Sequence, residues 1–179
     1  REKGPYAKCN PPMRSRDNVD ALWEYVFDGT IDTLGSDHGP YADQEKVKHG
    51  NFFKEYSGFG GYDAMLAGML TEGVHKRGLP LERLAALTSG HPARVMGLAP
   101  RKGALLPGAD ADIAVVNLDA EWVFDGTKSL SKTKSSHNIY HGSHLKGKVE
   151  QTWVRGELIY DHGTIKAARG YGRFVAKQK

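Results

Sequence analysis

Apolar residues recur at helical spacing in the first part of the chain. Between residues 16 and 29 they fall at i, i+3, i+4, i+7 and i+8, at Val19, Leu22, Trp23, Val26 and Phe27. This spacing places them on one face, so it predicts an amphipathic helix. Asp17 is positioned to cap the start of this helix, and Gly29 is positioned to close its end.

Further helices are predicted over residues 62–74 and in the segments LPLERLAAL and HPARVMGL, where Pro92 suits a first helical turn. The segment IDTLGSD, residues 31–37, follows the first helix at once and indicates a buried strand. So short a link between a helix and a strand is typical of α/β units.

The pattern changes near Arg101. Beyond it, glycine, proline and β-branched residues dominate, and DIAVVNL, residues 112–118, predicts a buried strand. The segment KVEQTWVRGELIYDHG predicts two strands joined by a tight turn at Arg155 and Gly156. We therefore expect an α/β segment over residues 1–100 and a small β-rich segment over residues 101–179.

The bulk composition narrows the class of protein. A chain of 179 residues can hold one ordinary domain or two small ones. It has no apolar run near the roughly 20 residues that span a bilayer, and its start lacks the apolar core of a signal peptide, so we expect a cytoplasmic protein with no membrane partner. The single cysteine, Cys9, excludes an internal disulfide framework and is interpreted as a small packed thiol.

The positive charge of the chain is unevenly distributed. Five lysines lie between Asp125 and Glu150 with no acid among them: Lys128, Lys132, Lys134, Lys146 and Lys148. Lysine clusters can bind phosphates, but few aromatic residues accompany these, so we expect a solvated loop and no nucleic acid partner. A basic binding module stays an alternative, which strongly salt-dependent nucleic acid binding would support.

The candidate chemistry lies where the predicted strand over residues 31–37 meets its loop. In open α/β sheets and (β/α)8 barrels, ligands bind beyond the carboxyl ends of the strands, and Asp37 and His38 occupy that place. An aspartate there can bind a metal through oxygen or move a proton. Capping of the next turn by the Asp37 side chain is an equally open alternative.

Other histidines point less clearly to a site. His137, His141 and His144 have the spacing of metal ligands, but no helical pattern or nearby acid in the sequence holds them, so a solvated loop is favoured over a zinc site. The sequence has no glycine-rich phosphate loop after a strand, no serine elbow and no CxxC pattern. The residues alone therefore indicate a segment of an α/β enzyme and leave metal dependence open.

Longer motifs add a resemblance to a known family. They are PP-x-R within CNPPMRSRDNV, GSDH at residues 35–38, PRKG…GADAD at residues 100–112, and the closing VRGELIYDHG and GYGRFV. In this order and spacing the chain resembles the carboxy-terminal part of the cyclic amidohydrolases, which are the hydantoinases, dihydropyrimidinases, allantoinases and dihydroorotases. Among these, IDTLGSDHG and GYGRFV are most similar to hydantoinases.

The resemblance implies an α/β fold. Residues 1–100 would form the last β/α unit and the carboxy-terminal helices of a metal-dependent (β/α)8 TIM barrel, and residues 101–179 would form strands of a small β-sandwich and a tail. It also implies two divalent metal ions, usually zinc, bridged by a carboxylated lysine and a hydroxide. That lysine and the histidine ligands are expected on a part of the protein outside these residues, and the isolated chain is expected to aggregate or to be inactive.

The implied reaction is hydrolysis of a cyclic amide C–N bond in a hydantoin or dihydropyrimidine ring. Matched onto this sequence, Asp37 would ligate a metal and act as the general acid/base, and His38 would support it. Asn10 matches a position that contacts the substrate ring, and Phe59 and Gly60 match a loop whose main chain meets the amide. The partners implied are a small cyclic amide and further copies of the chain, as a tetramer or dimer. An allantoinase, a dihydroorotase and a non-catalytic scaffold relative remain alternatives.

Overall fold

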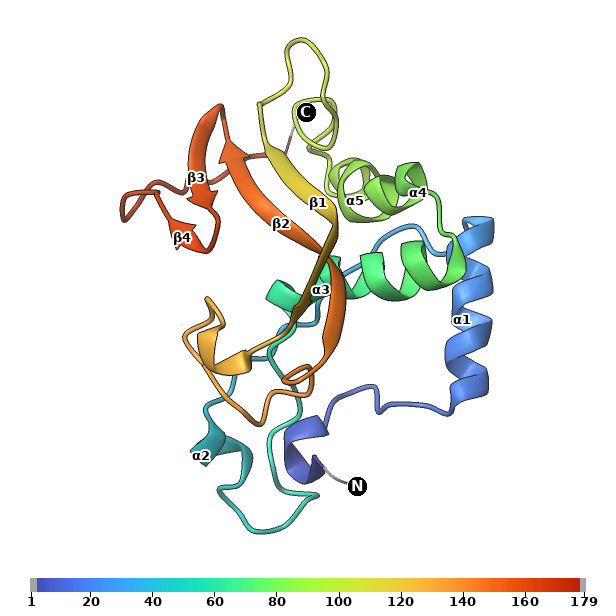
Figure 1. Ribbon diagram of the computed structural model, residues 1–179, viewed down its shortest axis with the longest axis vertical. Coiled ribbons are helices and arrows are strands. Elements are labelled where there is room, and N and C mark those ends of the chain that lie inside the picture. The colour runs from blue at the N-terminus through green and yellow to red at the C-terminus, as the bar shows by residue number, and fades with distance from the viewer. Residues whose placement is uncertain (1–2, 178–179) are drawn as a thin grey trace.

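The computed structural model describes residues 3–177, in which helices precede a curved sheet (Figure 1). The first long helix, α1 (Arg16–Asp28), confirms the prediction from apolar spacing. Ser15, not Asp17, is its N-cap, and Asp17 lies in the first turn, where a negative charge favours the helix dipole. Gly29 closes the helix at a φ of 94°, a left-handed conformation that costs glycine little.

Two short elements lie together at the lower end of the molecule in Figure 1. They are the 3-10 helix η1 (Gly4–Ala7) and the single-turn helix α2 (Asp43–Lys46). The carboxylate of Glu45 accepts a hydrogen bond from the main-chain N–H of Ala42 at 2.8 Å, which closes the start of α2.

The other predicted helices form, with π-helical turns inside two of them. Helix α3 (Tyr62–Met69) continues into the turn η2 (Leu70–His75), and α4 (Leu81–Ala85) continues into η3 (Ala86–Gly90). Helix α5 (His91–Val95) follows directly and has its proline in the first turn, as predicted.

The second part of the chain forms one antiparallel sheet in the order β1-β2-β3-β4. Its strands are β1 (Ile113–Val123), β2 (His144–Val154), β3 (Glu157–Asp161) and β4 (Thr164–Ile165), with the 3-10 helix η4 (Gly126–Lys128) after β1. The predicted turn between β2 and β3 is confirmed. Arg155 and Gly156 have φ values of 53° and 79°, and two successive positive φ values are what a type I′ hairpin turn requires.

The predicted strand over residues 31–37 is wrong in the described structure. Its main chain forms hydrogen bonds with helical segments. Ile31 N–H donates to Tyr25 O at 3.0 Å, and Leu34 N–H donates to Leu87 O at 3.1 Å. The sole ladder contact near it is an isolated parallel bridge of His38 with Phe59. A strand requires a neighbouring strand to bond with, and residues 3–177 offer this segment none.

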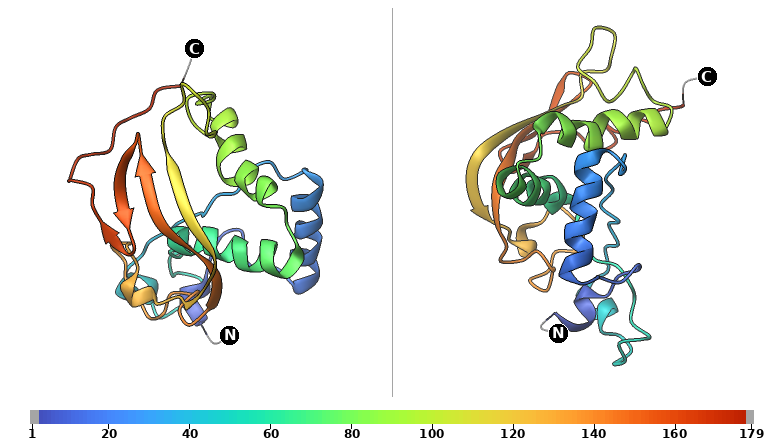
Figure 2. Two further views of the ribbon diagram at one scale, coloured as in Figure 1. Left: turned by 45° about the horizontal axis from the view of Figure 1, so that its top comes forward. Right: turned by 90° about the vertical axis from the view of Figure 1, so that its right-hand side faces the viewer.

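The strand predicted over residues 112–118 is confirmed by β1 (Ile113–Val123), but the expectation that this strand is buried is wrong. In β1, half-buried and exposed positions largely alternate. Val116 and Leu118 pack against the helices, while Val115 and Asn117 are exposed. The reason is that the helices cover one face of the sheet in the described structure, as Figure 2 shows, so alternate side chains point away from them.

The core joins the helices to the sheet through two clusters of buried side chains. One contains Ala64, Ala67, Phe124 and Leu145, and the other contains Leu70, Leu79, Leu84 and Leu87. The predicted division into domains at residues 100 and 101 stays a prediction. Within residues 3–177, no helix combines the length and apolar character needed to cross a membrane.

Candidate active site

The predicted site residues lie on three chain segments that meet through main-chain hydrogen bonds. Gly58 N–H donates to Lys8 O at 2.8 Å, and Gly39 N–H donates to Phe59 O at 3.1 Å. The first bond ties the loop around Phe59 to the segment that precedes the CNPP motif. The second ties the same loop to the GSDH motif, so segments far apart in sequence lie side by side.

Asn10 lies on the first of these segments and is exposed. Its amide Nδ2 donates to Ser57 Oγ at 3.1 Å, which holds the side chain against the loop that leads to Phe59. The neighbouring Cys9 is half-buried, and its Sγ lies 3.4 Å from Pro11 O, consistent with the interpretation of a packed thiol.

Asp37 combines an exposed carboxylate with a left-handed main chain, at a φ of 44°. Non-glycine residues adopt such a φ at some cost, and they concentrate at functional sites. An aspartate that capped the next turn would accept a main-chain N–H, and the carboxylate of Asp37 enters no hydrogen bond or ion pair within residues 3–177. The carboxylate is therefore available to bind a cation or to carry a proton.

His38 holds the start of α3. Its Nδ1 accepts the N–H of Gly61 at 3.1 Å and, at 3.5 Å, the N–H of Tyr62. The imidazole also meets the Tyr62 ring edge-on, with 4.4 Å between ring centroids. Because Nδ1 is an acceptor, a neutral His38 carries its proton on Nε2.

Phe59 and Gly60 lie in a loop whose main-chain carbonyls accept hydrogen bonds from other segments. Gly60 O accepts the amide Nδ2 of Asn138 at 3.1 Å, and a Cβ at Gly60 would lie 3.4 Å from that Nδ2 and 3.5 Å from Cε1 of His38. The main-chain N–H of Gly60 makes no hydrogen bond within residues 3–177. It is thus a free donor beside His38.

Lys46 belongs to this region, although nothing in its sequence context indicated it. The side chain is only 3% exposed, and its Nζ donates to Gly58 O at 2.7 Å, to Tyr56 O at 2.8 Å and to Lys8 O at 3.3 Å. Burial lowers the pKa of Lys46, and the nearby Lys8 ammonium lowers it further. The segment ADQEKVKHG has no apolar periodicity, so a buried lysine within it leaves no sequence signal.

The lysine- and histidine-rich loop is better ordered than the sequence indicated. Nδ1 of His137 lies 3.0 Å from Oδ2 of Asp43, and Nδ1 of His141 lies 3.5 Å from Oδ1 of Asp125. The sequence shows no acid near these histidines, but folding brings Asp43 of α2 onto His137 and Asp125 onto His141. Each histidine meets a single carboxylate, however, and residues 3–177 contain no group of three or more His, Cys, Asp or Glu placed to hold a metal.

Among the described residues, Asp37 is the one candidate metal ligand at this site. An exposed, unpaired carboxylate such as that of Asp37 is a suitable oxygen donor for zinc and other divalent ions. A site with two metals needs several further ligands, and within residues 3–177 none lies with Asp37 in a ligand group. Asp37 therefore suits an incomplete ligand set.

Comparison with known proteins defines the class. The model of the amidohydrolase family matches residues 7–159, and the chain belongs to this family. The resemblance stated from the sequence motifs is thereby confirmed.

Individual relatives carry several related names. Over 176 residues the chain is 37% identical to the L-hydantoinase of Paenarthrobacter aurescens, covering 98% of this chain and 38% of that protein. It is 38% identical over 167 residues to an allantoinase of Solibacter usitatus, covering 93% of this chain and 36% of that protein. It is also 38% identical over 160 residues to a dihydroorotase of Elusimicrobium minutum, covering 89% and 35%.

The fold agrees with these sequence matches. The solved structure of L-hydantoinase (dihydropyrimidinase) from Arthrobacter aurescens superimposes with a TM-score of 0.91 at 36% identity, covering 97% of this chain and 38% of that one. A D-hydantoinase structure gives a TM-score of 0.87 at 25% identity. The chain spans less than two fifths of the length of these relatives.

Proposed function

We propose that this chain forms part of an enzyme that hydrolyses the C–N bond of a cyclic amide in a hydantoin or dihydropyrimidine ring. The observation that carries the proposal is the convergence of Asn10, Asp37 and Gly60 on three hydrogen-bonded segments of an amidohydrolase-family chain. The names of the relatives agree with a cyclic amide substrate.

Asp37 is the proposed metal ligand and general acid/base. Divalent metal ions, zinc in the simplest case, would polarise the ring carbonyl and activate water when bound. A carboxylate oxygen of Asp37 takes the proton of the attacking water and delivers it to the amide nitrogen as the ring C–N bond breaks. The exposed carboxylate, unpaired within residues 3–177, supports this role because no neighbouring cation has to be displaced.

The remaining residues bind the ring. The free N–H of Gly60 is a donor for a ring carbonyl, and the amide of Asn10 can contact the ring from the adjoining segment. Phe59 directly precedes Gly60 in the loop, and its ring lies edge-on to Tyr140 at a centroid distance of 6.2 Å. The side chain of His38, which directly follows Asp37, is tied to the start of α3 and so supports the position of the carboxylate.

The proposal extends to the architecture of the whole protein. Residues 1–100 would complete a (β/α)8 barrel, and residues 101–179 would belong to a small β-sandwich beside it. The carboxylated lysine and the histidine ligands would come from residues outside this sequence. A homotetramer or dimer is the proposed assembly.

The test uses the complete polypeptide that contains these residues. Metal content and ring opening are measured with hydantoin, dihydrouracil, allantoin and dihydroorotate as substrates. We expect bound metal and turnover of one ring, and Asp37→Asn should lower kcat at least about 100-fold, the range typical of a lost general acid/base. Asp17→Asn, in the exposed first turn of α1, is the matched control and should leave kcat unchanged.

The four substrates also separate the alternative assignments. Turnover of allantoin or dihydroorotate alone would make the enzyme an allantoinase or a dihydroorotase, names that relatives of similar identity carry. Absence of both metal and turnover would overturn the proposal and favour a scaffold relative of the same fold.

A further inference from the structure

Lys46 has a buried ammonium group whose N–H donors all bind main-chain carbonyls. Its side chain is 3% exposed, and its ammonium has three N–H donors, matched by carbonyls at 2.7, 2.8 and 3.3 Å. No carboxylate lies within ion-pair distance of its Nζ in the described part of the chain. Burying an ammonium is costly unless its donors are satisfied, so this arrangement commits the side chain to holding the main chain.

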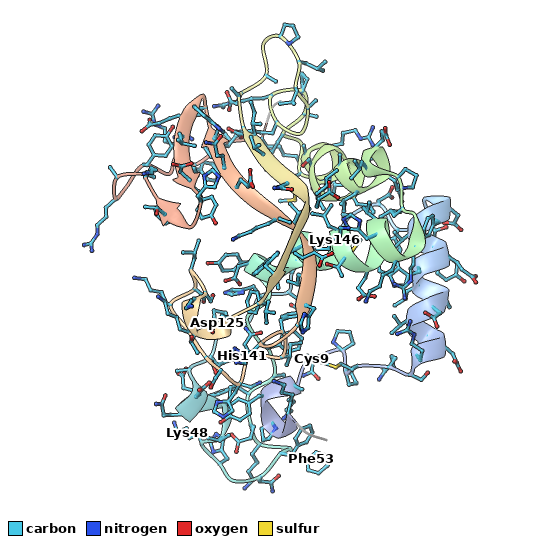
Figure 3. All side chains as sticks on the ribbon, in the orientation of Figure 1. Cys9, Lys48, Phe53, Asp125, His141 and Lys146 are labelled. Atoms are coloured by element: carbon cyan, nitrogen blue, oxygen red, sulfur yellow. The ribbon has the colours of Figure 1, made fainter. Side chains whose placement is uncertain are left out.

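Lys46 binds carbonyls on two segments, and both segments contain residues that we propose bind the substrate. Gly58 O directly precedes Phe59, and Lys8 O lies two residues before Asn10. In Figure 3, Lys48 is labelled beside α2, the helix that carries Lys46, and Cys9 is labelled on the connection between η1 and α1, directly after Lys8 in sequence. One side chain thus clamps both segments.

The loop has every carbonyl fixed in turn. Gly58 O accepts from Lys46, Phe59 O accepts from the N–H of Gly39 at 3.1 Å, and Gly60 O accepts from Asn138 at 3.1 Å. A peptide group is planar and trans, so its N–H points opposite to its C=O. The bond from Lys46 to Gly58 O therefore sets the direction of the Phe59 N–H, and the bond from Gly39 to Phe59 O sets the direction of the free Gly60 N–H one peptide further along.

We propose that Lys46 is a positioning residue of the active site, which holds the main chain of residues 58–60 so that the free N–H of Gly60 faces the cyclic amide. This inference rests on the proposed function. Lys46 touches no reacting atom and acts through the carbonyls of Gly58 and Lys8. Its removal should disorder the loop and weaken substrate binding more than it changes the chemical step.

The test compares Lys46→Met with Lys48→Met in the complete polypeptide. Met matches the aliphatic part of the lysine side chain and removes the N–H donors, while Lys48 is exposed and lies two residues away. We expect Lys46→Met to raise KM at least tenfold with a smaller change in kcat and an unchanged metal content, and Lys48→Met to match the wild type. A lower melting temperature with unchanged KM would show a purely structural lysine and overturn the proposal.

A second measurement does not depend on turnover. Hydrogen exchange followed by mass spectrometry on peptides covering residues 57–62 should show at least tenfold faster exchange in Lys46→Met and wild-type exchange in Lys48→Met. Unchanged exchange in Lys46→Met overturns the inference, whether or not the wild type is active. Absence of ring opening by the wild type contradicts only the proposed function. If Lys46→Met does not fold, Lys46→Gln replaces it, because the shorter glutamine side chain has two N–H donors in place of three. Wild-type KM and exchange in that variant overturn the inference.

Discussion

The Nδ1 atom of His38 accepts a hydrogen bond from the main-chain N–H of Gly61 at 3.1 Å, across 23 positions of sequence. The bond joins the residue after Asp37 to the start of α3 and determines which imidazole nitrogen carries the proton. The orientation of the GSDH motif therefore depends on one acceptor atom, and substitutions can test this directly.

His38→Asn should preserve this contact, because the Oδ1 of asparagine can take the place of Nδ1 as an acceptor. His38→Leu removes the acceptor and leaves the N–H of Gly61 without its partner, which should cost about 1 kcal/mol of unfolding free energy. Urea unfolding of both variants checks the difference. Equal losses in the two variants would show that the accepted hydrogen bond contributes nothing to stability.

Two substitutions of Asp37 should separate the effect of its main-chain conformation on stability from the effect of its carboxylate on activity. Asparagine tolerates the left-handed region nearly as well as aspartate, whereas alanine does not, so at a φ of 44° Asp37→Ala should be less stable than Asp37→Asn by about 1 kcal/mol. Both variants lack the carboxylate and should be equally inactive. Thermal unfolding and initial rates measured side by side provide the check, and equal stabilities would mean that the main chain relaxes at this position.

Local patterns were enough to predict the helices and the hairpin. The spacing of Val19, Leu22 and Trp23 determines which face of α1 is apolar, and this holds wherever the helix packs. The turn at Arg155 and Gly156 likewise depends on the residues beside it. These elements formed as predicted because neighbours in sequence decide them.

Long-range contacts explain what the sequence could not show. Residues 31–37 are hydrophobic enough for a strand, but a strand also needs a partner, and the hydrogen bonds of Ile31 and Leu34 go to helical segments instead. The bond from Asn138 to Gly60 spans 78 positions of sequence, and no local pattern announces it. The motif resemblance points to Asp37 and Gly60 as candidate site residues, whereas the groups that hold these segments in place emerged only from the fold.

Gly147 should be essential to the packing of β2 on the helices. A Cβ added there would lie 2.7 Å from Cδ1 and 2.9 Å from Cβ of Leu70, and the residue has a φ of 95°. Gly147→Ala therefore combines a main-chain cost with overpacking of a buried leucine and should lose about 2 to 4 kcal/mol of stability.

Gly163 offers the matched control for that substitution. Its φ is 93°, and no atom lies within 4 Å of an added Cβ. Gly163→Ala carries the main-chain cost alone and should lose about 1 kcal/mol. Denaturant unfolding of the two variants checks the difference, and similar losses would show that Leu70 moves aside without penalty.

Lys102 should make stability depend on pH at the start of the sheet. The hydrogen bond from Lys102, at 2.9 Å, is the largest influence on the pKa of Asp110 and lowers it below its ordinary 3.8. Burial opposes this shift to a smaller extent, and a hydrogen bond from Arg101 adds to the lowering. The folded state therefore keeps this carboxylate charged where the unfolded chain would protonate it. The resulting stabilisation is present above the ordinary pKa and is lost as the pH falls through the lower folded-state value.

Lys102→Met should accordingly be less stable than the wild type near neutral pH, and the difference should shrink below about pH 4. Lys132→Met, at an exposed position, is the control and should follow the wild-type curve throughout. Urea midpoints measured between about pH 7 and pH 2.5 test this expectation. A gap between Lys102→Met and the wild type that stayed constant with pH would mean that the lysine contributes through the packing of its aliphatic chain and not through the charge of Asp110.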